Sequence, residues 1–275
     1  MLSNIFALVG ATVFAAFYLL PISAQAQATV PLVGSAGVAM PLEVTADDGI
    51  EWRQEDKFFI ASGNAVATRG DIVVHSNLLR AHYRDAINGR TEIWRLDAEG
   101  SVTITAPNQI ATGELGLFDI DNGVFVLSGG DVRYITPDSV IRADTQLEYW
   151  TDKQLAVARG NATTTRDDKT LRADVLSAHF GKGKDGSLRV HRIEAFDNVR
   201  IITAEETASS QRAVYDVVSG IAVLTGDVSI TRGETQLKGC RADVNIDTGI
   251  SRLRACGNGG GRVRGLISPN KSEAK

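Results

Sequence analysis

Short stretches in which apolar and polar residues alternate recur along most of this chain. Val102-Thr103-Ile104, Val132-Arg133-Tyr134, Val199-Arg200-Ile201 and Val228-Ser229-Ile230 are examples. A period of two gives each stretch one apolar and one polar face, as in a half-buried strand. Turn signals such as Val218-Ser219-Gly220 leave too few residues between stretches for a helical crossover. The pattern therefore predicts short antiparallel strands.

The alternation belongs to an internal repeat of about thirty residues. Each copy opens on a pair of small or turn-forming residues, at intervals of 37, 30, 30, 37, 29 and 31 residues. The two long intervals contain loop insertions at 84–90 and 181–186. The seven pairs are Gly63-Asn64, Gly100-Ser101, Gly130-Asp131, Gly160-Asn161, Asp197-Asn198, Gly226-Asp227 and Gly257-Asn258.

A second element repeats with the same spacing, because residues 76–83 match residues 173–180 column by column. Its ring column holds His82, Phe118, Tyr149, His179 and Tyr215. Two features with one spacing favour a single stack of antiparallel strands over residues 41–267, closing as two sheets around one apolar seam.

The N-terminal segment has the pattern of a secretory signal. An apolar run from Ile5 to Leu20 precedes the small-x-small motif Ala24-Gln25-Ala26. We expect a signal peptide at 1–26, a flexible linker at 27–40 and a disordered tail at 268–275. The alternative is an uncleaved anchor, because the first four residues include no Lys or Arg. Either alternative places the remainder outside the cytoplasm.

The two cysteines, Cys240 and Cys256, are equidistant from Thr248 in a predicted Asp-Thr-Gly turn. An antiparallel hairpin in that register would place them opposite each other, and an oxidising compartment would then favour a cross-strand disulfide. Two reduced, buried thiols are the alternative. Two cysteines without a matching His pair do not form a zinc site.

Composition and motifs argue against nucleic-acid binding and catalysis. The 29 basic and 33 acidic side chains give a net charge of −4, which does not suit a polyanion. Gly181–Gly186 fits GxGxxG, but the following residues alternate like a strand and do not open a phosphate-binding helix. The four histidines lack metal-ligand spacing. We expect no catalytic residue, metal or cofactor; a polysaccharide-acting enzyme with paired carboxylates is an open alternative.

The repeat resembles the OstA-like (LptA) family of periplasmic lipopolysaccharide-transport proteins. Leu224–Ile230, with its Gly226-Asp227 pair, and Ile141–Asp144, followed by Tyr149, carry the resemblance, which covers nearly all of residues 41–256. The Gly-rich end from Gly257 departs from the family pattern.

The resemblance implies an elongated, twisted antiparallel β-jelly roll of about seven repeats of two short strands. It implies a periplasmic, non-enzymatic carrier that shields lipid A acyl chains and bridges inner- and outer-membrane export proteins. Open strand edges would dock partners, including further copies head to tail. A membrane-anchored component with the same fold is the alternative.

Because side chains alternate along a strand, the residues two and four positions after each pair should share one face and line the seam. Ordinary core packing without a ligand is the alternative for each of them. We expect Ile104→Asp or Ile201→Asp to abolish lipid crosslinking while secretion continues. The predicted lining is Ala65, Ala67, Val102, Ile104, Val132, Tyr134, Val199, Ile201, Val228 and Ile230.

Overall fold

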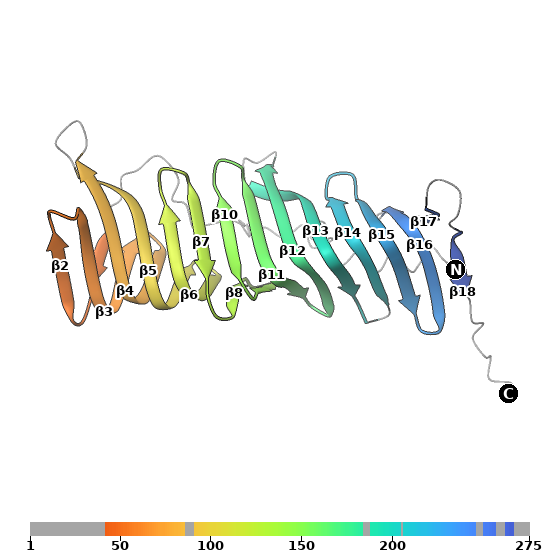
Figure 1. Ribbon diagram of the computed structural model, residues 1–275, viewed down its shortest axis with the longest axis horizontal. Helices are drawn as coiled ribbons and strands as arrows, with labels where there is room; N and C mark the ends of the chain where they lie inside the picture. Colours follow the sequence, from red (N-terminus) through yellow and green to blue (C-terminus); the bar gives the residue numbers. More distant parts are fainter. Residues whose placement is uncertain are drawn as a thin grey trace, which may run out of the picture. The chain divides into compact units, whose positions relative to one another are not determined.

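The computed structural model describes residues 42–85, 91–183, 188–204, 206–245, 250–256 and 262–266, and every regular element in these ranges is a β-strand (Figure 1). The all-β, antiparallel class predicted from the alternation is therefore confirmed. The strands are β1 (Glu43–Thr45), β2 (Gly49–Arg53), β3 (Phe58–Arg69), β4 (Ile72–Asp85), β5 (Thr91–Ala106), β6 (Gln109–Asp119), β7 (Val124–Ser128), β8 (Val132–Ile135), β9 (Val140–Ala143), β10 (Gln146–Trp150), β11 (Leu155–Arg166), β12 (Lys169–Lys182), β13 (Leu188–Ile202), β14 (Thr207–Asp216), β15 (Ile221–Arg232), β16 (Thr235–Asn245), β17 (Ile250–Arg254) and β18 (Arg264–Leu266).

The chain divides into two compact units, which are described separately. Among the described residues, unit 1 comprises those within 163–178 and 190–266, and unit 2 comprises those within 42–162 and 179–189. The expected signal peptide, linker, Asp-Thr-Gly turn, Gly257-Asn258 pair and C-terminal tail lie outside the described residues. Within the described ranges, no helix has the length and apolar character needed to cross a bilayer.

In unit 2, long strands such as β3 and β6 pair with different neighbours over their two halves. In β3, residues 58–62 pair with β2, whereas residues 66–68 pair with β1. Strand β6 is shared in the same way, since residues 115–119 pair with β7 and residues 110–112 pair with β8. Each of these strands therefore bends between two layers of one continuously paired sheet, an arrangement that agrees with the predicted jelly roll.

The bend falls at the small-residue pairs that mark the repeat. The β3–β4 register shifts between Ser62 and Ala65, and Gly63 and Asn64 there have φ angles of 79° and 43°. A Cβ at Gly63 would lie 2.4 Å from Asp48 Oδ2, so glycine is needed both for the angle and for the space. The pair forms a bulge inside a continuous strand, which is why several strands are longer than the sequence pattern predicts.

Unit 1 repeats this arrangement in β13–β18. Strands β13, β14, β15 and β16 pair in sequence order and lie side by side in Figure 1. The second half of β16 pairs with β17, and its first half pairs with β18. Register shifts follow Phe196 in β13 and Thr225 in β15, at the predicted pairs Asp197-Asn198 and Gly226-Asp227. The turn at Val218–Gly220 is present as predicted.

Apolar side chains that alternate along these strands form the interior of each unit. In unit 2, Leu127 and Val132 are fully buried in a cluster with Phe125 and Tyr149. In unit 1, Leu224 and Ala242 occupy the corresponding cluster, with Val244. Since the strand period is two, the residues between these positions face outward.

Candidate functional site

The ten residues predicted to line the seam lie two and four positions after the small-residue pairs, on the inward face of their strands. The first inward positions, Ala65, Val102, Val132, Val199 and Val228, are at most 1% exposed. At the second inward positions, Ala67, Ile104 and Ile230 are also buried, whereas Tyr134 and Ile201 remain partly exposed. The predicted face is therefore the interior of both units.

Packing brings seven of the ten residues together within their own units. Val102, Ile104 and Val132 belong to the buried cluster of unit 2, and Tyr134 packs against it. Burial raises the pKa of the Tyr134 hydroxyl to about 12, and this hydroxyl donates a hydrogen bond of 2.6 Å to Gln109 Oε1. In unit 1, Val228 and Ile230 share a cluster, against which Ile201 packs.

Partly buried apolar side chains border each cluster, and sequence reasoning identified only Tyr134 and Ile201 among them as lining residues. In unit 2, Phe180 meets the Tyr149 ring edge-on, with the ring centroids 6.1 Å apart. These side chains mark where the apolar interior reaches solvent. The partly buried set of unit 2 is Ile72, Val74, Leu79, Phe118, Tyr134, Leu147, Ala156 and Phe180; that of unit 1 is Ile201, Ala213, Ala222 and Leu253.

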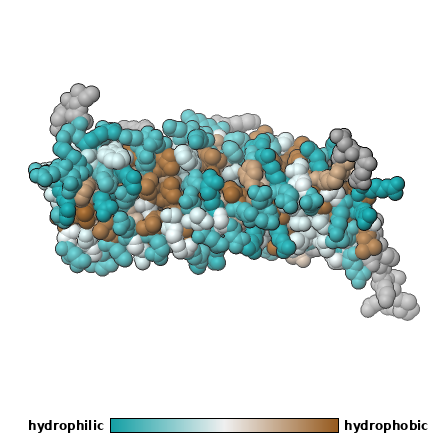
Figure 2. Space-filling model, viewed as in Figure 1, coloured by the Kyte–Doolittle hydropathy of each residue, from teal (hydrophilic) through white to brown (hydrophobic). Residues whose placement is uncertain are grey.

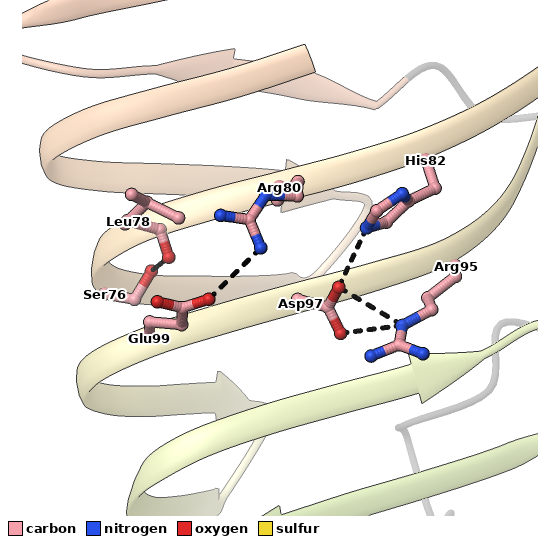
Figure 3. Close-up of polar contacts among 7 residues, drawn as sticks. All are labelled: Ser76, Leu78, Arg80, His82, Arg95, Asp97 and Glu99. Atoms are coloured by element: carbon pink, nitrogen blue, oxygen red, sulfur yellow. Dashed lines mark hydrogen bonds and ion pairs between the residues drawn. The ribbon is translucent and has the colours of Figure 1, made fainter. Parts of the chain in front are cut away.

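The outer faces carry both charged and apolar side chains. Hydrophilic and hydrophobic residues alternate on the face shown in Figure 2. On the outer face of β4 and β5, Asp97 accepts a hydrogen bond of 2.9 Å from Arg95 Nε and lies 3.0 Å from His82 Nε2 (Figure 3). Beside it, Arg80 and Glu99 form an ion pair at 3.3 Å. His82 therefore has a structural partner in Asp97.

Two further outward carboxylates, Glu148 and Glu194, are buried beneath arginines. Burial by itself would raise the pKa of Glu148, but hydrogen bonds from Arg159, Gln146 and Trp150 more than offset it and hold the pKa below 4.5. For Glu194 the same opposition of burial and hydrogen bonds, from Arg192 and Arg212, also gives a lowered pKa. The folded protein therefore favours the ionised carboxylate form of both side chains.

We expect these two carboxylates to make the stability of the folded protein depend on pH. Because their folded pKa values lie below the unfolded ones, their stabilisation is complete above the unfolded pKa and is lost as the pH falls through the folded pKa. Thermal unfolding between pH 7 and pH 3 should show the midpoint falling below about pH 4.5. A Glu148→Gln/Glu194→Gln variant should be less stable at pH 7, and its unfolding midpoint should change less with pH in this range. An unchanged pH slope would show that the two groups do not contribute.

Cys240, in β16, and Cys256, after β17, are joined by a disulfide, with their Cα atoms 5.0 Å apart. The expected hairpin register is wrong by one residue, since Arg241 pairs with Arg254 and Asn245 with Ile250. Continued along the strands, this register places position 255, and not Cys256, opposite Cys240. Cys256 follows the end of β17, where the chain has left the ladder and can approach Cys240 without direct pairing.

The described residues contain no group of three or more His, Cys, Asp or Glu side chains that could hold a metal ion. His75 and His82 lie on β4, His179 on β12 and His191 on β13. The GxGxxG segment falls partly outside the described residues. The geometry thus centres on an apolar interior between two sheet faces.

A family model matches most of the described chain. A family model described as LptA/(LptD N-terminal domain) LPS transport protein matches residues 43–154 and again residues 140–250. An uncharacterized protein of Rhizobium meliloti (strain 1021) is 26% identical over 129 residues, covering 45% of this chain and 68% of that protein. The crystal structure of LptH, the LptA homologous periplasmic component of the lipopolysaccharide transport device of Pseudomonas aeruginosa, covers 48% of this chain and 95% of its own, at 17% identity and a TM-score of 0.40.

Proposed function

Since the chain belongs to the LptA/LptD N-terminal domain family of lipopolysaccharide-transport proteins, we propose that it shields the acyl chains of lipid A in its apolar interior. The inward alternation of apolar residues carries this proposal. The family consists of transport proteins, so the alternative of a polysaccharide-acting enzyme is not retained.

The chemistry of the cargo explains the need for such an interior. Each methylene removed from water contributes about 0.8 kcal/mol, so several exposed acyl chains would cost tens of kcal/mol. The partly buried side chains, such as Leu79, Phe118 and Phe180, supply apolar surface that an acyl chain can reach. The deeper residues, such as Val102 and Val132, support this surface from within. Sugars and phosphates would stay outside, in water.

We place the function in the periplasm, between inner- and outer-membrane transport proteins. Strands in a sheet lie about 4.8 Å apart, so the number of strands limits the length of one chain's stack, and a longer path needs partners docked at strand edges. In β2 all five residues are exposed, including Ile50 and Trp52. Strand β18 is also exposed throughout. These strands are the proposed docking sites for partners or for further copies arranged head to tail.

The direct test is the lipid that the exported chain carries. The chain should be purified in mild detergent from cells that make lipopolysaccharide, and the bound lipid identified by mass spectrometry. We expect lipid A species at a fixed ratio to protein, and competition by added lipid A but not by its deacylated sugar. Phospholipid alone, or no lipid, would contradict the proposal.

A further inference from the structure

The outer face of β13–β17, in unit 1, differs in charge from the equivalent face of unit 2. The strand registers place fifteen outward positions in three cross-strand rows of five, which alternate with the buried interior positions. One row runs Glu194, Val214, Val223, Asp243 and Arg252. We call this surface the arginine face. Its five arginines are Arg192, Arg212, Arg241, Arg252 and Arg254.

These arginines outnumber the carboxylates of the same face. Glu194 is bound by Arg192 and Arg212, and Asp243 by Arg241 and Arg254. With Asp216, three carboxylates face five arginines, which leaves a surplus of two positive charges. The arginines on the ion pairs keep 41–62% of their side chains exposed, so their guanidinium groups can still be reached from solvent.

Exposed aliphatic side chains lie at one end of the arginine face. Ile221 and Ile250 belong to its end row and are 40% and 52% exposed. Val218, in the turn between β14 and β15, is 85% exposed. Arginines next to exposed aliphatic side chains suit the interface of a membrane, where guanidinium groups meet phosphates and the aliphatic groups enter the headgroup boundary.

The equivalent face of unit 2 shows that the fold does not require this charge. Strands β5, β6, β7, β10 and β11 give the same three rows of five outward positions. Their arginines are Arg95 and Arg159, against four carboxylates, which leaves a net charge of −2. At the position that corresponds to Ile221, Val124 is only 9% exposed.

From this contrast we infer that the arginine face is a docking surface for a bilayer containing anionic phospholipid. The occupant follows from charge complementarity and from the aliphatic end row, since a phosphate-bearing headgroup layer meets both features. The inference is independent of the proposed carriage of lipid A, because it uses the outer face and leaves the interior unchanged.

The test measures how the full chain partitions onto vesicles of phosphatidylcholine with and without about one third phosphatidylglycerol, which carry no lipopolysaccharide. The N-terminal apolar run at Ile5–Leu20 would enter either vesicle, so the quantity compared is the ratio of anionic to neutral partitioning. The test variant is Arg252→Glu/Arg254→Glu. Asp243 keeps Arg241 in this variant, so the buried carboxylate is not left alone.

We expect a ratio well above one for the native chain and a fall of about thirtyfold in the variant, because each arginine near an anionic surface contributes about a fivefold gain in binding. Arg69→Glu/Arg142→Glu makes the same charge change on exposed residues of unit 2 and should stay within about twofold. A native ratio near one, as expected if the face instead binds an acidic protein, overturns the inference. Equal losses in both variants overturn it as well.

Discussion

Replacing Val132 by aspartate will destabilise unit 2 by about 4 kcal/mol or more, because the change places a carboxyl group in a fully apolar site. Val132 is 0% exposed and lies in the cluster with Leu127 and Val102. The new carboxyl group will fold only in its neutral form, so its folded pKa will rise and part of the loss will be recovered as the pH falls. Urea unfolding followed by far-ultraviolet circular dichroism at pH 7 and pH 4.5 measures both effects.

The control for this prediction lies three residues away on the same strand. Ile135 faces outward and is 36% exposed, so Ile135→Asp should change stability by less than about 1 kcal/mol. Val132→Ala, which removes apolar contacts without adding charge, should cost about 2 kcal/mol. Equal unfolding midpoints for the two aspartate variants would mean that Val132 does not face the interior.

The inward positions were predictable because strand alternation is a local property. A residue two positions after Gly100 or Gly226 has to face the same side as its counterparts, whichever strand it pairs with. Val102 and Val228, both 1% exposed, face the interior as the alternation requires. The prediction required no knowledge of the sheet order.

The bends were not predictable in the same way. Gly63 and Asn64 satisfy a turn and an in-strand bulge equally well, since both need positive φ angles. Only the pairing of β3 with β1 and β2 distinguishes the two. The one-residue error at Cys240 and Cys256 has a similar cause, because symmetry about a turn residue fixes a register only when the loop has an odd number of residues.

The border of the interior depends on contacts that the local pattern does not encode. Phe118 and His82 occupy one repeat column, yet Phe118 packs against the buried cluster and His82 pairs with Asp97 on the outer face. The strand registers explain the difference, because Leu96 pairs with both Ala81 and Phe118, whereas His82 pairs with Arg95 one position further along and so faces the opposite side. Phe180 contacts Tyr149 from a distant strand, so its place at the border follows from tertiary structure alone.

The structure also separates the two substitutions expected to abolish lipid crosslinking. Ile104 is 5% exposed within the buried cluster, so Ile104→Asp would test folding before it tests lipid binding. Ile201 is partly exposed and packs against the edge of its cluster. Its neighbour Ile202 is 39% exposed and faces the opposite side of the same strand. The two adjacent isoleucines therefore form a matched pair.

Ile201→Asp should reduce crosslinking to a photoreactive lipopolysaccharide by about tenfold or more, whereas Ile202→Asp should leave it unchanged. The loss corresponds to the apolar contact of one isoleucine side chain, about 1.5–3 kcal/mol, together with the cost of a carboxylate beside an acyl chain. Crosslinking is normalised to the folded fraction from thermal unfolding, and the uncharged variant Ile201→Thr should give a smaller loss in the same direction. If Ile201→Asp folds and crosslinks as strongly as Ile202→Asp, acyl chains do not pass along the inward face of β13.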